Sequence, residues 1–170
     1  MGAPFVALGG LIGSDVLKYH PRMKVTEHPF NSGEEVVVAE AIRPDVGIAH
    51  ALKADKFGNV IVPKRSEYAL VAQASHRAVA MTEEIVDGEL TMEQALEIGG
   101  TLVPAIHIDA VVLAPHGAHP GGCSNNYPTD DVHMREYIES SKNDEAFAEY
   151  LDKYIYSLPD HEAYLTKIGL

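Results

Sequence analysis

The feature that most constrains the fold is a series of short apolar runs, each stopped by glycine, proline or a small polar turn. Residues 4–8, 35–39, 46–50 and 60–62 are such runs, and residues 102–114 contain the strongest one. Short apolar runs between turn residues indicate β-strands, and a run that is apolar on both faces is typical of a parallel sheet covered on both sides. We therefore predict several short strands, with residues 4–8 buried in a parallel sheet.

Further strands and turns extend this pattern. Residues 23–27 alternate between apolar and polar side chains, and residues 78–85 again have strand character. Residues 55–59 have the composition of a tight turn, which predicts a hairpin between the strands at 46–50 and 60–62.

Helix signals alternate with the strands. Ser66 predicts the N-cap of a helix that runs through Ser75, and Thr91 with Gln94 forms a capping-box pattern ahead of a short helix. The last part of the chain is predicted to be helical, with an apolar stripe at helical spacing, namely Phe147, Leu151, Tyr154 and Ile155. Strands mixed with helices and followed by a helical tail indicate an α/β fold with a largely parallel sheet and flanking helices.

Composition and length indicate one globular domain. Of the 170 residues, 46% are hydrophobic and 22% are charged, which excludes disordered, collagen-like and disulfide-scaffold chains. A chain of this size buries about 70% of its unfolded surface, enough for one core. We expect a single domain over residues 1–170.

The charge balance excludes one large class of partner. There are 13 lysine and arginine residues against 25 aspartate and glutamate residues, which gives a formal charge of −12 and repels a nucleic-acid backbone. Cys123 is the only cysteine, so no internal disulfide forms. The first residues lack a basic signal region, and no apolar run approaches the ~20 residues that a membrane span requires. We predict no nucleic acid, no membrane and a cytoplasmic location.

The densest group of chemically active side chains follows the strand at 102–114. His116, His119 and Cys123 lie in a segment rich in glycine and proline, where zinc binding and a purely structural crossing loop are both possible. A third reading is a binding loop, because open α/β sheets bind ligands outside the carboxyl ends of their strands, and His119 is then a donor to a substrate. The segment has no second cysteine to complete a zinc site, and we therefore expect no bound metal.

Other candidate groups carry weaker signals. The glycine-rich turn at residues 8–15 is a weak signal for an anion site, and Ser14 and Asp15 there fit a helix cap better than a nucleophile and its partner. Cys123 is either a nucleophile near His119 or a buried thiol. His50 is expected to be a satisfied core or interface histidine, and acidic pairs are expected to be solvated turns and caps, namely Glu34 with Glu35, Glu83 with Glu84 and Asp130 with Asp131.

Two segments carry a family resemblance. Residues 108–120, followed by Cys123, and residues 46–59, which read V-x-I-x-H-x-x-x-A-D-x-x-G-N, closely resemble the alpha subunit of glutaconate CoA-transferase and related class I CoA-transferases. Further segments resemble that family in the same order, namely residues 4–15, 27–34, 82–85 and 160–165. The resemblance covers nearly the whole chain.

This resemblance implies that CoA moves from an acyl-CoA thioester to a free carboxylic acid. In the family a glutamate attacks the thioester, passes through an acyl-glutamyl anhydride and becomes an enzyme-CoA thioester, which splits one difficult exchange into two steps. That glutamate belongs to the beta subunit, so we expect no catalytic residue here and no permanently bound cofactor, with CoA and acyl-CoA as substrates.

The resemblance is to the C-terminal half of an alpha subunit. The first half, with its glycine-rich oxyanion segment, has no counterpart here, and the Gly9-Gly10 pair is not that segment. We expect a partial alpha subunit from a short gene, a split gene or a fragment, inactive alone and assembled with a separate N-terminal alpha half and a beta subunit. The alternatives are a subunit of a CoA-thioester or ring-cleaving hydrolase and a noncatalytic interaction module.

The residues expected to support the substrate pocket lie in two segments. His116 stands where the glutaconate enzymes are expected to have tyrosine, which leaves the identity of the accepted acid open. The pocket candidates are Ser14, His116, Gly117, His119, Gly121 and Gly122.

Overall fold

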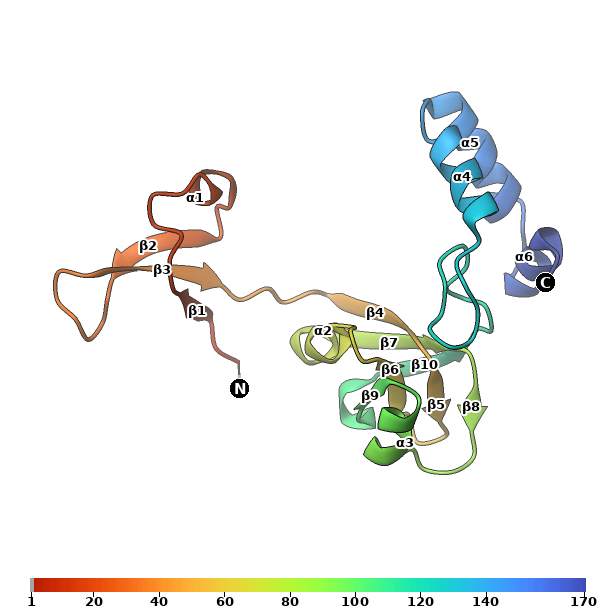
Figure 1. Cartoon of the computed structure of the whole chain (residues 1–170), viewed down its shortest axis with the longest axis horizontal. Helices are drawn as coiled ribbons and strands as arrows, with labels where there is room; N and C mark the ends of the chain where they lie inside the picture. Colours follow the sequence, from red (N-terminus) through yellow and green to blue (C-terminus); the bar gives the residue numbers. More distant parts are fainter. Residues whose placement is uncertain (1) are drawn as a thin grey trace. The chain divides into compact units, whose positions relative to one another are not determined.

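The computed structural model describes residues 2–170. The chain forms two compact units, Met1–Arg43 and Pro44–Leu170, and Figure 1 follows them from red to blue along the sequence. The single domain over residues 1–170 stays a prediction.

The first unit is built on a small antiparallel sheet. Its strands are β1 (Phe5–Leu8), β2 (Met23–Glu27) and β3 (Glu35–Glu40), in the order β1-β3-β2, and a short helix, α1 (Val16–Tyr19), follows the glycine-rich turn. The strand predicted at residues 4–8 is present, but the parallel, buried environment was wrong, because β1 pairs antiparallel with β3 and Phe5 and Val6 are exposed. An apolar run specifies a strand, while its pairing depends on residues far along the chain.

The second unit contains two sheets. One is parallel, in the order β10-β7-β4, and consists of β4 (Val46–Ala51), β7 (Arg77–Thr82) and β10 (Ala110–Leu113). The other is mixed, in the order β8-β5-β6-β9, and consists of β5 (Lys53–Asp55), β6 (Val60–Pro63), β8 (Ile85–Val86) and β9 (Gly100–Val103). With its helices this unit confirms the α/β fold class, and the parallel sheet is the one that positions the site.

The predicted hairpin has a different first strand. β6 pairs antiparallel with β5, whereas the strand at 46–50 is part of the parallel sheet. The turn itself is as predicted: the buried Asp55 carboxylate accepts the backbone N–H groups of Phe57 and Asn59. A turn of this kind fixes only the residues next to it, so it pairs the three-residue β5 with β6.

The run at residues 102–114 is not one strand. It is divided into β9, the 3-10 turn η1 (Ala105–His107) and β10, and β9 and β10 belong to different sheets. Pro104 lies at the break, and proline lacks the N–H that a central strand must donate.

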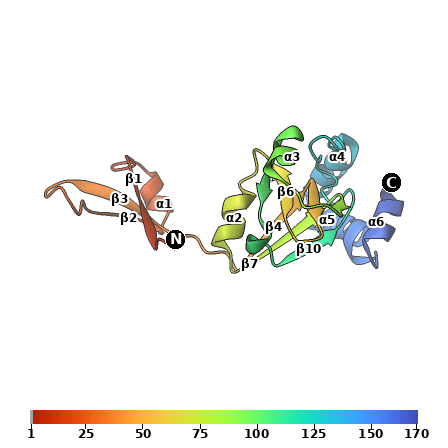
Figure 2. The same ribbon diagram turned by 90° about the horizontal axis from the view of Figure 1, so that it is seen from below.

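Two helices complete the core of the second unit. α2 (Tyr68–Ala74) packs on β4 and β7, as Figure 2 shows, and α3 (Met92–Glu97) begins at the predicted capping box of Thr91 and Gln94. Ser66 accepts the backbone N–H of Tyr68, so the predicted helix start is correct to within two residues. The Ala72 side chain lies in the core cluster with Ala78 and Ala80 of β7, on one face of the parallel sheet.

The helical tail is confirmed, with one change of register. It consists of α4 (Asp131–Ser140), α5 (Asp144–Leu151), the π-helix η2 (Asp152–Tyr156) and α6 (His161–Ile168). Tyr154 of the predicted stripe is buried, whereas Ile155 is exposed. A π-helical turn adds a residue to the repeat and so rotates later side chains off the 3.6-residue stripe. Among residues 2–170, no helix has the length and apolar character needed to cross a bilayer.

Candidate functional site

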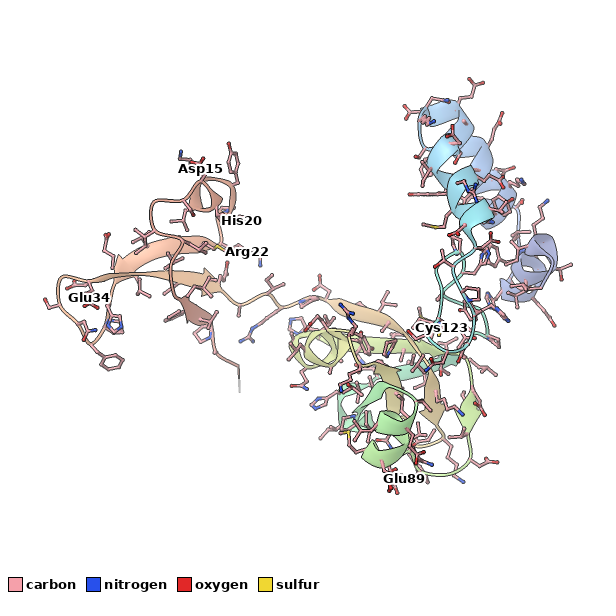
Figure 3. All side chains as sticks on the ribbon, viewed as in Figure 1. Asp15, His20, Arg22, Glu34, Glu89 and Cys123 are labelled. Carbon is pink, nitrogen blue, oxygen red and sulfur yellow. The ribbon has the colours of Figure 1, made fainter. Side chains whose placement is uncertain are left out.

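The carboxyl ends of β4, β7 and β10 meet at one edge of the parallel sheet, because the strands run in the same direction. His50 lies near the end of β4, Glu83 directly follows β7, and His116 comes shortly after β10. Ligands of open parallel sheets bind at such an edge. The loop 114–130 lies there, and Figure 3 labels its Cys123.

The Glu83 carboxylate joins three parts of this edge. One oxygen accepts the backbone N–H of His116 (2.8 Å), and the other accepts the Tyr127 hydroxyl (2.7 Å) and the Nε2 of His50. The side chain of Glu83 is only 9% exposed, whereas that of Glu84 is 54% exposed and pairs with Lys53. The solvated turn predicted for this acidic pair is therefore wrong for Glu83 and correct for Glu84.

Hydrogen bonding sets the charge state of this carboxylate. Burial acts to raise the pKa of Glu83, but the hydrogen bonds from His116, Tyr127 and His50 outweigh it and hold the pKa below the ordinary glutamate value. The Glu83 side chain is thus an anion that accepts three hydrogen bonds from the protein.

Tyr127 connects Glu83 to the middle of the loop. Its hydroxyl donates to Glu83 and accepts the backbone N–H of Ala118 (3.0 Å), while its ring stacks on His116 at a centroid distance of 4.5 Å. Burial, followed by the hydrogen bond to Glu83, raises the pKa of Tyr127, so the hydroxyl keeps its proton. The loop backbone around 116–118 is therefore held in one conformation.

Gly117 is required where the loop crosses His50. A Cβ atom at this position would lie 2.8 Å from the Ala114 carbonyl oxygen and 2.9 Å from Cε1 of His50, which is closer than real Cβ contacts. The Nδ1 of His50 is buried and has no hydrogen-bond partner among the described residues, so it is best accommodated as the unprotonated ring nitrogen, with Nε2 donating to Glu83.

Cys123 has the properties of a buried structural thiol. It is in the core, and burial, followed by the negative charge of Glu83, raises the pKa of its thiol to about 11. Because the thiolate is the reactive form, this shift makes Cys123 a poor nucleophile near neutral pH.

His119 belongs to a second cluster, which faces the helical tail. Its Nδ1 bonds the Tyr164 hydroxyl of α6 (2.6 Å) and its Nε2 bonds Asp130 (3.2 Å), whose other oxygen caps α4 by accepting the N–H of His133. His161 also bonds the carbonyl oxygen of Pro115 (2.7 Å). The helical tail is thus fastened to the loop through histidine side chains.

Two hollows adjoin the loop. An open one of about 510 Å³ is lined by residues 122–129, and one of about 380 Å³ is lined by His119 and Pro120 together with residues of the tail, namely Tyr150, Tyr154, Ile155, Leu158, Pro159, Asp160 and Tyr164.

The sequence-predicted candidates are only partly brought together. His116, Gly117, His119, Gly121 and Gly122 lie on the same loop. Ser14 lies in the first unit, where its Oγ donates to the carbonyl oxygen of Leu11 (2.7 Å). Glu83 and Tyr127 were not identified from the sequence as site residues, and His50 was predicted to be a core or interface histidine. The signal for Glu83 was its position just after a predicted strand, where ligands of parallel sheets bind.

The donor atoms form two groups that are close enough to hold a metal ion. One consists of His50, Glu83 and Cys123, and the other of His119, Asp130 and His133, with ligand atoms within 4.8 Å of one another in each. The predicted pair of His119 and Cys123 is therefore divided between two clusters. Both nitrogens of His119 and both oxygens of Glu83 are already hydrogen-bonded, so the absence of a metal stays our prediction.

Curated proteins similar to the chain are longer than it. The alpha subunit of glutaconate CoA-transferase from Acidaminococcus fermentans is 33% identical over 87% of this chain and 46% of its own length. The corresponding subunit of 3-oxoadipate CoA-transferase from Pseudomonas knackmussii is 32% identical over 99% of this chain and 58% of its own length. A cholesterol ring-cleaving hydrolase subunit of Rhodococcus jostii is 26% identical over 98% and 58%. The chain spans about half the length of these relatives.

The fold agrees with a solved member of this group. The crystal structure of glutaconate coenzyme A-transferase from Acidaminococcus fermentans superposes with a TM-score of 0.85 at 29% identity, over 99% of this chain and 57% of that one. The model of the family described as coenzyme A transferase matches residues 3–114, more than half of the chain. The chain therefore belongs to the coenzyme A transferase family.

Proposed function

We propose that the chain is part of the alpha subunit of a CoA-transferase and supports the transfer of CoA from an acyl-CoA to a carboxylic acid. The observation that carries the proposal is the likeness, over 99% of the chain, to a solved glutaconate CoA-transferase. The partners we propose are the remaining half of the alpha subunit and a beta subunit, in the cytoplasm, with no permanent cofactor.

The role of this chain is to shape the pocket. Glu83 has its oxygens occupied by three donors and its pKa lowered, which makes it an anchor for the loop. Above that anchor the loop contributes the proposed pocket residues His116, Gly117, His119, Gly121 and Gly122, and Ser14 stays a candidate on the first unit. Preorganised donors of this kind stabilise a developing oxyanion by about 3 kcal/mol each in acyl transfer.

The test is CoA exchange by the assembled complex. The chain, purified with the rest of an alpha subunit plus a beta subunit, is incubated with an acyl-CoA and a second carboxylic acid, and the acyl-CoA products are separated by chromatography. We expect the new acyl-CoA and a glutamyl-CoA thioester in the partner chain that is trapped by borohydride. Exchange catalysed by the 170-residue chain alone would refute the proposal.

Hydrolysis is the second candidate, favoured by the ring-cleaving hydrolase among the relatives. The same assay without an acceptor acid distinguishes it, because release of free CoA indicates a hydrolase. A complex that neither exchanges nor releases CoA and forms no trapped thioester supports a noncatalytic interaction module.

A further inference from the structure

Three tyrosine rings line the hollow of about 380 Å³ between the loop 114–130 and the helical tail. They are Tyr150, Tyr154 and Tyr164, and the remaining lining consists of His119, Asp160 and apolar side chains. The volume lies in the range of small-molecule pockets, which hold about 300–1,000 Å³. Of these residues only His119 is a candidate for the substrate pocket, so the proposed function leaves most of this hollow without a role.

The three rings are held in place by their hydroxyl groups. Each hydroxyl is hydrogen-bonded to a different side chain, and the pairs are Tyr150 with His133 (2.8 Å), Tyr154 with Glu136 (2.9 Å) and Tyr164 with His119 (2.6 Å). The rings of Tyr150 and Tyr154 also lie against each other, at a centroid distance of 5.0 Å. Side chains that are already ordered lose little conformational entropy when a ligand binds, so these rings form a preorganised wall.

The rings attract positive charge. The face of an aromatic ring is negative, and a cation within about 6 Å of the ring centroid is stabilised. Tyr154 shows this behaviour, because the ammonium group of Lys153 lies 4.5 Å from its ring centroid. Lys153 is paired with Glu136 (2.6 Å) and is not part of the lining, so its charge is balanced outside the hollow.

The polar groups of the hollow disfavour an anion. Both ring nitrogens of His119 are engaged, Nδ1 by Tyr164 and Nε2 by Asp130, so the imidazole has no free N–H for an anionic ligand. Asp160 adds an exposed carboxylate, one oxygen of which caps α6 by accepting the N–H of Ala163 (2.9 Å). The formal charge of −12 also attracts cations at long range. A positively charged ligand therefore matches the site.

The apolar part of the lining selects among cations. It consists of Pro120, Ile155, Leu158 and Pro159. A primary ammonium group or a metal ion has to keep its water or receive a full set of acceptors, which apolar side chains and engaged hydroxyl groups do not supply. A quaternary ammonium group has no N–H to satisfy, and aromatic side chains around its methyl groups are a recurrent mode of recognition.

We propose that this hollow binds a quaternary ammonium group, with Tyr150, Tyr154 and Tyr164 as its aromatic wall and Asp160 as its counter-ion. The inference goes beyond the proposed function, because the ligand is a methylated organic cation and not an acyl-CoA or a carboxylic acid.

Calorimetric titration of the 170-residue chain with choline, and with the neutral analogue of choline in which a carbon atom replaces the nitrogen, tests this assignment. The two ligands have nearly the same shape, so the difference in their dissociation constants measures the response to charge. We expect choline to bind about tenfold more tightly, because cation–π contacts act on choline alone. Equal dissociation constants, or no saturable binding of either ligand, would overturn the inference.

Two substitutions locate the ligand. Asp160→Asn removes the charge but keeps an oxygen to cap α6, so choline binding should weaken about threefold while binding of the neutral analogue is unchanged. Tyr164→Leu removes a ring and should weaken choline binding about tenfold, whereas Tyr164→Phe keeps the ring and should weaken it less. Tyr156→Leu is the matched control, because Tyr156 belongs to the same tail, is 73% exposed and does not line the hollow.

Circular dichroism shows whether each variant is folded, and Tyr150→Leu takes the place of Tyr164→Leu if the latter is not. Unchanged choline binding in both Asp160→Asn and the folded ring variant would overturn the inference. An equal loss of binding in Tyr156→Leu would also overturn it, because the ligand would then lie elsewhere on the tail.

Sedimentation with phosphatidylcholine vesicles distinguishes two sources of the ammonium group. Co-sedimentation of the chain indicates a lipid headgroup, choline binding without co-sedimentation indicates a free solute, and both support the site. None of these measurements uses CoA or a partner chain. Failure of choline binding therefore counts against this inference alone, and failure of CoA exchange counts against the proposed function alone.

Discussion

Replacing Glu83 by glutamine tests whether the buried carboxylate holds the site together. Glutamine has one carbonyl oxygen for three donors. Its NH2 group would face either the backbone N–H of His116 or the two donors Tyr127 and His50, depending on the orientation of the amide. A hydrogen bond to a charged group contributes about 1.5–3 kcal/mol, so the loss of one or two predicts a fall of about 1.5–6 kcal/mol in the free energy of unfolding.

Urea denaturation followed by circular dichroism measures this difference, with Glu89→Gln as the matched control. Glu89 is an exposed glutamate on the loop between β8 and α3, as Figure 3 shows, and its replacement is expected to change stability by less than about 0.5 kcal/mol. An unfolding midpoint for Glu83→Gln equal to that of Glu89→Gln would refute the anchoring role.

The pH dependence gives an independent check of the same prediction. The pKa of Glu83 is lowered in the folded protein, so its stabilisation is complete above the ordinary value of 4.5 and is lost as the pH falls through the lower folded value. The difference in unfolding free energy between the wild type and Glu83→Gln should be constant from pH 6 to 8 and should decrease as the pH falls below about 4.5. A difference that widens in acid would contradict the assigned charge state.

Three further predictions concern the loop. Tyr127→Phe removes the hydroxyl between the Glu83 carboxylate and a backbone N–H, and a loss of about 1–3 kcal/mol is expected in urea denaturation; an unchanged midpoint would contradict it. Gly117→Ala places a Cβ against His50 and lowers stability by about 1–3 kcal/mol, while Gly88→Ala, which has open space, leaves the melting temperature nearly unchanged. Cys123, with its pKa raised to about 11, is expected to react with maleimide at pH 7.5 far more slowly in the native chain than in urea, and equal rates would show that the thiol is accessible.

The parts of the fold that local chemistry determines were predicted from sequence. The capping box at Thr91, the turn held by Asp55 and the strands at 23–27, 46–50 and 60–62 all depend on residues close in sequence, and the structure confirms them. Strand pairing was less predictable, because it depends on distant residues: residues 4–8 became an antiparallel strand. Pro104 is the residue whose missing N–H explains why the run at 102–114 is not one strand.

The site residues could not be grouped correctly by their closeness in sequence. His119 and Cys123 are close along the loop but point into different clusters, whereas Glu83 reaches His50 and the backbone of His116 across 33 residues in each direction. Glu83, His50 and His116 lie together because all three stand at the edge where the parallel strands end.

This arrangement also bears on where the attacking carboxylate lies. A nucleophilic glutamate needs a free lone pair directed at the thioester, whereas the oxygens of Glu83 accept three hydrogen bonds and its side chain is 9% exposed. Each donor stabilises the anion and so lowers its reactivity, which is the same effect that lowers its pKa. Glu83 is therefore suited to fix the loop and unsuited to attack, so the reaction we propose requires a glutamate other than Glu83.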